Sequence, residues 1–337
     1  MQMRELTGTG IATSALGFGT ASLFHLPQAR ARRAVLEAAF DAGIRHVDVA
    51  PMYGLGRAEA ELAPFLEGRR DAITVATKFG IDTTVAGRAA GRVQGPVRSL
   101  LGARPGVGRQ LKRSGGGPAS GMVGSLLYRS PGYTAAAAAA SLERSLRALR
   151  TEYVDIFELH DPQGGLDRGL PELVDFLEEQ RERGRIRAWG IAGDVGTADP
   201  VITSLATTAP VVQYRRDIFD EPRGPGGRAT ITFGILERAL PAIREFLQAE
   251  SGRCATWSRR LGTDVNDDSV LAQLLVREAI DRATSGPVLF TSTRVDRVLA
   301  AATTADAPSA SDPERAAALV DLADAVRGNR PGLRGER

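Results

Sequence analysis

Short apolar runs rich in β-branched residues alternate along the chain with longer stretches in which alanine, leucine, arginine and glutamate recur at helical spacing. This alternation is typical of repeated strand–helix units around a parallel sheet. The apolar runs predict eight strands, at Ser14–Gly19, Arg45–Val49, Ile73–Thr77, Val154–Leu159, Ile186–Ile191, Pro210–Tyr214, Thr230–Phe233 and Pro287–Thr291. Helices are expected at 28–42, 56–68, 134–150, 170–183, 198–208, 234–249, 268–284 and 294–302. Eight strands with interleaved helices favour a closed (β/α)₈ TIM barrel over an open sheet.

Two segments do not follow this alternation. Residues 83–132 are rich in glycine, arginine, serine and proline, which predicts a long insertion loop that acts as a lid, is partly disordered, or both. Residues 328–337 read as a disordered tail. We therefore expect one barrel domain over 1–327, a size that such barrels commonly reach, with the insertion inside it.

Composition limits the class of protein. Cys254 is the single cysteine of the 337 residues, which excludes a disulfide framework and fits a reducing compartment. No cysteine and histidine spacing suggests a metal site. The first residues lack the apolar core of a signal peptide, and no apolar run is long enough to span a bilayer. The sequence thus predicts a cytoplasmic protein without membrane association.

The positive charge of the chain is concentrated in one place. The net charge is +3, yet the segment from Ile81 to Tyr133 has eight basic residues against Asp82 alone, so that it carries +7 and the rest carries −4. Nucleic-acid-binding proteins more often spread basic residues over folded elements, with aromatic residues between them. We therefore expect no nucleic-acid partner.

Four chemically useful residues follow strand ends. Asp48 and Tyr53 lie in GIRHVDVAPMYGLGRAEAEL, Lys78 closes AITVATKFG, and His160 closes YVDIFELHDP. In a parallel barrel the carboxyl ends of all strands lie on one face, where active sites are built. Each residue alone has a simpler explanation as a cap, a solvated charge, a partner of a backbone carbonyl or a packing ring. Four on one face are better explained by catalysis.

Together these residues can deliver a proton to a carbonyl. Tyrosine has an ordinary pKa near ~10, and a nearby ammonium favours its phenolate and lowers that pKa. We expect Lys78 to supply this ammonium and Asp48 to keep it charged and oriented. A neutral His160 can donate a hydrogen bond to the substrate oxygen.

These motifs resemble the aldo-keto reductase family, in particular its bacterial and plant sugar-dehydrogenase-like branch. LTGTGIATSALGFGTASL resembles the N-terminal hairpin and first strand of the family, and the segments around Asp48, Lys78 and His160 follow in the same order over most of the chain. The resemblance implies that Tyr53 is the general acid, that Lys78 and Asp48 tune it, and that His160 orients the substrate. It implies NADP(H)-dependent reduction of an aldehyde or ketone to an alcohol, or the reverse oxidation.

The resemblance also implies a cofactor site. Gly19, Thr20 and Asp48 belong to it, Gln213 matches the family glutamine at the nicotinamide carboxamide, and Phe233 is a candidate for stacking on the ring. Where the family has a Ser-Asn pair, this chain has Ala192 and Gly193. Losing two neutral hydrogen bonds would cost on the order of 1 kcal/mol each, less if water or backbone replaces them.

The segment VLFTSTRVDRV resembles the part of the family that binds the adenosine phosphate. Ser292, Thr293 and Arg294 open the last barrel helix, whose N-terminus favours an anion. Arg294 or Arg297 would pair with a 2′-phosphate and select NADP(H). The alternative is an ordinary capped helix with surface arginines.

The substrate is not named by the sequence. Phe24 and His25 are expected to line its pocket, and the basic insertion favours an anionic or carrier-bound carbonyl compound, or the cofactor phosphates. A solvated insertion without a ligand is the alternative. Two other functions stay open: a barrel with a degenerate cofactor site that acts as a non-redox isomerase, cyclase or dehydratase, and a nucleotide-binding regulatory homologue.

Overall fold

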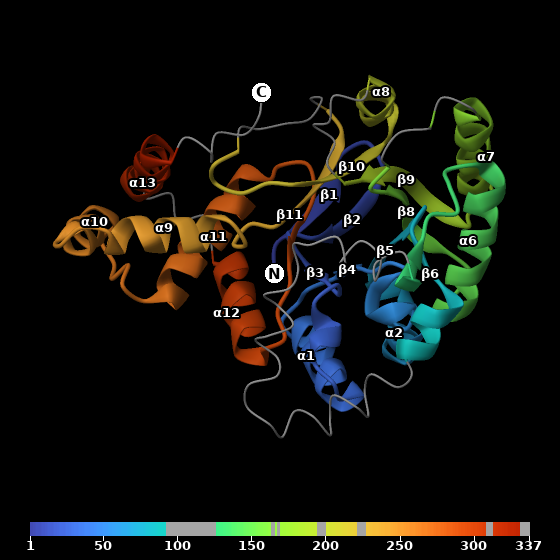
Figure 1. Ribbon diagram of the computed structural model, residues 1–337, viewed down its shortest axis with the longest axis horizontal. Coiled ribbons are helices and arrows are strands. Elements are labelled where there is room, and N and C mark those ends of the chain that lie inside the picture. Colours follow the sequence, from blue (N-terminus) through green and yellow to red (C-terminus); the bar gives the residue numbers. More distant parts are fainter. Residues whose placement is uncertain are drawn as a thin grey trace.

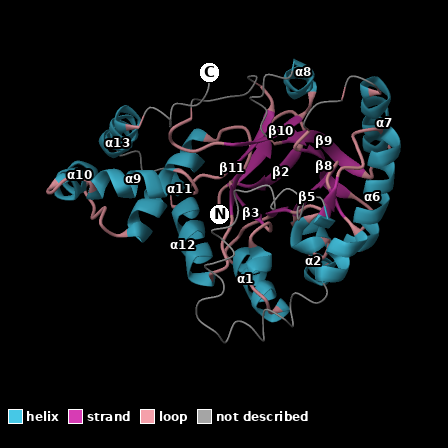
Figure 2. Cartoon of the chain, viewed as in Figure 1, coloured by secondary structure: helices cyan, strands magenta, loops and turns pink. Residues whose placement is uncertain are grey.

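Eight parallel strands close into a barrel at the centre of the molecule, and helices surround it (Figures 1 and 2). The computed structural model describes residues 1–91, 126–162, 166, 169–193, 200–220, 227–307 and 313–330. The spatial order of the strands is β10-β11-β12-β3-β4-β5-β8-β9. They are β3 (Leu16–Gly19), β4 (His46–Asp48), β5 (Thr74–Phe79), β8 (Val154–His160), β9 (Ile186–Ala192), β10 (Val211–Arg215), β11 (Ala229–Phe233) and β12 (Val288–Phe290). Each overlaps a predicted strand, which confirms the (β/α)₈ fold.

The helices that follow the strands pack on the outside of the barrel. They are α1 (Ala29–Asp41), α2 (Ala58–Leu66), α6 (Ala135–Leu149), α7 (Leu170–Glu182), α8 (Pro200–Thr208), α11 (Asp268–Arg282) and α12 (Val295–Asp306). The alanine-rich start of α6 shows why such a helix begins where it does. The Thr134 hydroxyl accepts a hydrogen bond from Ala137 N at 3.2 Å and caps the first turn. The main core fills the layer between strands and helices, where Phe157, Leu142 and Leu177 are fully buried.

A hairpin closes the amino end of the barrel, as the resemblance implied. Strands β1 (Met3–Leu6) and β2 (Ile11–Ser14) pair antiparallel. Leu6 and Ile11 are fully buried and pack into the barrel interior against Ala76, Ile156, Ala188, Val211, Ala229, Ile231 and Leu289. These apolar side chains form a plug at the bottom of the barrel.

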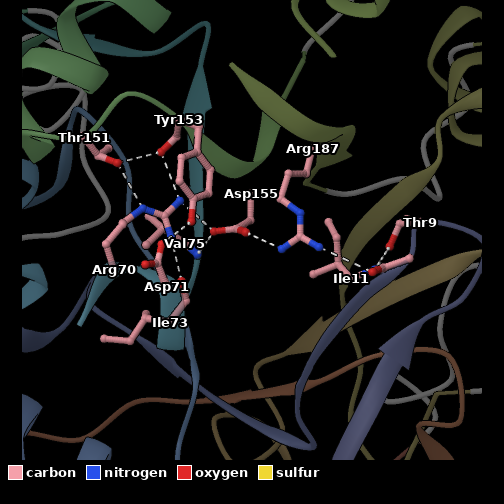
Figure 3. Close-up of polar contacts among 11 residues, drawn as sticks. Thr9, Ile11, Arg70, Asp71, Ile73, Val75, Thr151, Tyr153, Asp155 and Arg187 are labelled. Carbon is pink, nitrogen blue, oxygen red and sulfur yellow. Dashed lines mark hydrogen bonds and ion pairs between the residues drawn. The ribbon is translucent and has the colours of Figure 1, made fainter. Parts of the chain in front are cut away.

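A buried carboxylate ties three strands together near this closed end (Figure 3). Asp155 Oδ2 accepts hydrogen bonds from Val75 N at 2.9 Å and from Arg70 Nη2 at 2.8 Å, and its Oδ1 accepts one from Arg187 Nη1 at 2.9 Å. Arg187 also donates to Gly10 O in the hairpin at 3.4 Å. The cluster therefore links β5, β8 and β9 to the hairpin, away from the carboxyl ends of the strands.

Three helices form a lobe beside the barrel: α9 (Ala239–Gln248), α10 (Arg253–Leu261) and α13 (Pro313–Asn329) (Figure 1). The lobe has its own core with α11, in which Trp257, Leu261, Leu319 and Leu322 are buried. Helix α9 begins at Ala239, five residues after the expected start. The pattern predicted neither α10 nor α13. Helix α13 extends to Asn329, so residues 328 and 329 of the expected tail are helical, and residues 331–337 lie outside the described residues.

The described ends of the basic insertion are held by a small sheet. Strands β6 (Asp82–Thr83) and β7 (Tyr128–Arg129) pair antiparallel. Asp82 is buried and forms ion pairs with Arg88, Arg129 and Arg144, at 3.4, 3.2 and 3.4 Å. The lid hypothesis for the insertion concerns mainly residues 92–125, which lie outside the described residues. Among the helices described, none is long and apolar enough to cross a membrane.

We predict that Asp155→Ala lowers the free energy of unfolding by about 3 kcal/mol, because it leaves Arg70 and Val75 N without their buried acceptor. Urea denaturation followed by circular dichroism measures this change. The control is Asp71→Ala, since Asp71 is exposed and accepts, among the described residues, one 3.3 Å hydrogen bond, from Tyr153. Equal effects of the two substitutions would contradict the structural importance of the Asp155 cluster.

Candidate active site

The carboxyl ends of β4, β5 and β8 bring three of the four predicted catalytic residues to one face. Asp48 ends β4, Lys78 is the penultimate residue of β5, and His160 ends β8. Tyr53 begins a short 3-10 helix (Tyr53–Leu55) in the loop after β4. The Tyr53 ring meets the His160 ring edge-on, with centroids 6.0 Å apart and an interplanar angle of 85°.

The Lys78 ammonium lies between two carboxylates inside the barrel. Its Nζ donates a hydrogen bond to Asp48 Oδ2 and lies 3.3 Å from Glu158 Oε2. Lys78 and Glu158 are directly opposite each other on the adjacent strands β5 and β8. The side chains of Lys78, Asp48 and Glu158 are 1%, 4% and 0% exposed, so water contributes little to their solvation.

The two carboxylates keep Lys78 charged. Burial alone would lower the pKa of Lys78, but Asp48 and Glu158 outweigh this effect and raise the pKa above its ordinary value. For Glu158 burial dominates, and it raises the pKa to about 7 although Lys78 opposes the shift. One ammonium therefore faces two carboxylates, of which Glu158 takes up a proton near neutral pH.

Lys78 lowers the pKa of Tyr53, as expected, but it does not set the net direction. Burial is the larger effect and raises the pKa of Tyr53 above its ordinary value, so that Lys78 offsets only part of the increase. Asp48 and Glu158 add smaller contributions in the upward direction. The physical reason is that a phenolate here would add a charge to a poorly solvated cluster that already holds two carboxylates. Tyr53 is thus held in its neutral, proton-carrying form.

His160 is held in its neutral form. Burial, and then the Lys78 charge, lower the pKa of His160 to about 3. Its Nδ1 is buried and has no hydrogen-bond partner among the described residues. The Tyr133 hydroxyl donates to the main-chain oxygen of His160 at 2.6 Å, which fixes the end of β8. A neutral imidazole at this position can donate one hydrogen bond to a substrate oxygen, as the sequence suggested.

Three neighbours of this cluster were not assigned a role from the sequence. They are Glu158, Tyr133 and His46, whose ring is fully buried and whose two nitrogens have no partner among the described residues. Burial, and then Lys78, lower the pKa of His46 to about 3. Two of them could have been found from the sequence, because residues two apart in a strand point to the same face. His46 lies two residues before Asp48, and Glu158 lies two residues before His160. Tyr133 approaches from a distant segment that no local pattern identifies.

The residues expected at the nicotinamide end lie beside this cluster. Gly19 pairs with Asp48 across β3 and β4, and Thr20 Oγ1 donates to Asp48 O at 2.9 Å. Gln213 and His160 each pair with Ala192, so β8, β9 and β10 meet there. The Gln213 side chain is 3% exposed, and its Oε1 is buried without a partner among the described residues. Gly193 N donates to Gln213 O at 3.0 Å.

The residues expected at the ring-stacking and phosphate positions come from the other side of the barrel. Phe233 ends β11, and the Arg215 guanidinium lies 5.4 Å from its ring centroid. Ser292 Oγ accepts a hydrogen bond from Arg294 N at 3.1 Å immediately before α12. The Arg294 guanidinium is exposed and pairs with Asp296 at the start of the helix. Thr293 is half-buried and Arg297 is exposed, so both can be reached from solvent.

The two residues expected to line the pocket differ in their surroundings. The Phe24 ring packs against the backbone of Gly54, next to Tyr53: a Cβ at Gly54 would lie 2.5 Å from that ring. Phe24 is therefore near the candidate acid. His25 is exposed, at the end of a 3-10 helix (Leu23–His25). Within the described residues, no group of three or more histidine, cysteine or acidic residues could hold a metal ion.

The comparisons with known proteins agree with this fold. The aldo/keto reductase family profile matches residues 15–213, which contain all four candidate catalytic residues. The chain belongs to the aldo/keto reductase family. Its fold is the TIM barrel of this family.

Curated relatives match part of the chain. D-threo-aldose 1-dehydrogenase from a Pseudomonas species is 35% identical over 195 residues, which are 56% of this chain and 53% of that protein. Pyridoxal 4-dehydrogenase from Microbacterium luteolum is 44% identical over 82 residues, or 23% and 24% of the two chains. The chain thus spans about half the length, or less, of the curated relatives it matches.

Solved structures extend the likeness to the whole fold. An aldo-keto reductase from Bacillus halodurans in its holo form superimposes with a TM-score of 0.67 at 20% identity, over 97% of this chain and 96% of that chain. An aldo-keto reductase from Klebsiella pneumoniae in complex with NADPH gives 0.61 at 20% identity, with the same coverage. At this identity the likeness concerns the fold.

We predict that Glu158→Gln stabilises the protein increasingly as the pH rises. The folded-state pKa of Glu158 is about 7 against an ordinary 4.5, so the folded protein retains a proton that the unfolded chain releases between these values. The wild type therefore loses stability relative to the variant across this window, by about 3 kcal/mol at pH 8. Urea unfolding of both proteins at pH 4.5 and pH 8 measures the difference.

The matched control is Glu67→Gln, because Glu67 is exposed after helix α2. Its stability should follow that of the wild type at both pH values. Parallel wild-type and Glu158→Gln curves would show that Glu158 does not change its protonation in this range.

Proposed function

We propose that this chain catalyses NADP(H)-dependent reduction of a small aldehyde or ketone to an alcohol, or the reverse oxidation. The observation that carries the proposal is the buried Lys78 ammonium, held by Asp48 beside the neutral Tyr53 and His160 at the carboxyl end of a family barrel. The names of the curated relatives, an aldose 1-dehydrogenase and a pyridoxal 4-dehydrogenase, support a small hydroxylated aldehyde or its cyclic form as the substrate.

In this proposal Tyr53 is the proton donor. A bound NADPH supplies the hydride for the carbonyl carbon. Tyr53 transfers its proton to the carbonyl oxygen, and Lys78 stabilises the phenolate that remains, since its positive charge favours that form. His160, neutral because its pKa is about 3, donates a hydrogen bond that orients the carbonyl oxygen. Asp48 keeps the ammonium directed toward this reaction centre.

The residues present fit a nicotinamide cofactor. Gln213 offers a buried Oε1 without a partner among the described residues, which suits an N–H of a carboxamide. Phe233 offers a ring at the end of β11 for stacking. Arg294 is exposed at the N-terminus of α12, where an anion is favoured, although a 2′-phosphate would have to displace its pairing with Asp296. Two solved structures of aldo-keto reductases from Klebsiella pneumoniae, one in complex with NADP and one in complex with NADPH, support the same choice of cofactor.

Deuteride transfer tests the proposed reaction directly. The protein is incubated with NADPH that carries two deuterium atoms at C4 and with a panel of small aldehydes and hydroxy-aldehydes, and the alcohol products are analysed by mass spectrometry. We expect one deuterium on the former carbonyl carbon of the product. A product formed without NADPH, or without deuterium on carbon, would favour a non-redox barrel enzyme. Binding of NADPH without any turnover would favour a regulatory homologue.

We predict that Tyr53→Phe lowers kcat by roughly 10²–10⁴-fold, because the proton donor is removed. Binding of NADPH, measured by isothermal titration calorimetry, should be retained. The control is Tyr153→Phe, since Tyr153 lies in the Asp155 cluster near the closed end of the barrel. An unchanged kcat in Tyr53→Phe would remove Tyr53 from the chemical step.

A further inference from the structure

Asp161, the residue after His160, occupies the space beside Gly193. A Cβ atom at Gly193 would lie 2.8 Å from Asp161 Cα and 2.9 Å from Asp161 Oδ1. The backbone joins the same strand ends, because Asp161 N donates to Ala192 O at 2.5 Å and Gly193 N donates to Gln213 O at 3.0 Å. The Asp161 carboxylate therefore lies where a side chain at position 193 would begin.

The backbone of both residues supports this arrangement. Gly193 has a φ of 150° and Asp161 a φ of 47°, both in regions that favour glycine. Aspartate and asparagine tolerate the left-handed region better than most residues, so the conformation of Asp161 costs little. An asparagine at 193, which the family resemblance implied, would instead have to displace Asp161. Asp161 can occupy its position only because residue 193 has no side chain.

An acceptor without a partner faces the same strand ends. Gln213 is 3% exposed, and its Oε1 has no hydrogen-bond partner among the described residues. Leaving a buried acceptor unsatisfied costs on the order of 1–3 kcal/mol, which a donor on a ligand would recover. The Asp161 carboxylate, which is half-buried, is a second acceptor beside these strand ends. Two acceptors thus lie on adjoining strand ends.

We propose that Asp161, together with Gln213, binds the nicotinamide carboxamide in place of the Ser-Asn pair that is absent at Ala192 and Gly193. A primary carboxamide carries two N–H donors, and these two side chains supply two acceptors. The proposal rests on the proposed function, because it assigns a further residue to the same cofactor site. Asp161, which follows β8, thus replaces side chains that the family has after the next strand in the chain, here β9.

A carboxylate has a second effect that a neutral Ser-Asn pair lacks. Hydrogen bonds to a charged acceptor are stronger than those to a neutral one. The oxidised nicotinamide ring carries a positive charge, and the reduced ring carries none. Asp161 therefore binds both forms through the carboxamide but stabilises the oxidised form more, since opposite charges attract.

The test compares three probes on the full chain by isothermal titration calorimetry: NADP⁺, NADPH and 2′-phospho-ADP-ribose, which lacks the nicotinamide. The variants are Asp161→Ala and Asp161→Asn, the latter keeping the size and backbone tolerance of aspartate. We expect Asp161→Ala to raise the Kd of both dinucleotides about tenfold or more and to leave the fragment unchanged. We expect Asp161→Asn to weaken NADP⁺ several-fold more than NADPH. The control is Asp175→Asn, on the exposed face of α7, with no effect on any probe.

Two results would overturn the proposal. Unchanged dinucleotide binding in Asp161→Ala would show that Asp161 does not contact the nicotinamide. Equal losses for the dinucleotides and the fragment would show that it only supports the local backbone. In both cases the wild type would still transfer deuteride, so the proposed function would stand. A wild type that binds neither dinucleotide would overturn the proposed function itself.

Discussion

The site of this protein depends on one ammonium group inside a barrel. Removing a charge from water costs several kcal/mol or more, and a lysine buried alone would lose its proton instead. Lys78 keeps its proton because Asp48 and Glu158 lie on the two neighbouring strands. Strand order and register are thus chemical as well as structural requirements. A slip of one residue in β8 would turn Glu158 away from the interior and replace it with an apolar neighbour.

Burial decides the protonation state of each group around Lys78. His160 stays neutral, Tyr53 keeps its proton, and Glu158 becomes titratable near neutral pH, all because charged forms are poorly solvated there. Inference from residue types gave only part of this result. The presence of a lysine near Tyr53 correctly predicts an effect that lowers the pKa of Tyr53. Desolvation is larger and raises this pKa, but it depends on the burial of the ring, which cannot be derived from the residue types.

The fold could be predicted further than the details of the site. All eight barrel strands were visible as apolar runs, because strands buried on both faces contain few polar residues. Helices α10 and α13 were missed because they belong to a separate lobe, with its own core around Trp257 and Leu322. In the chain, α10 interrupts the strand–helix alternation and α13 follows it. Asp48, Lys78 and His160 could be selected as candidates because they lie at strand ends. Asp161 could not, since its proposed role depends on a contact with Gly193, 32 positions away in the chain.

The hairpin plug has a consequence for the direction from which a ligand approaches. Leu6 and Ile11 fill the amino end of the barrel and pack against apolar side chains of its interior. The cluster around Lys78 lies toward the carboxyl ends of the strands instead. The hairpin at the start of the chain thereby closes the end of the barrel where no chemistry takes place and leaves the carboxyl end for the ligands.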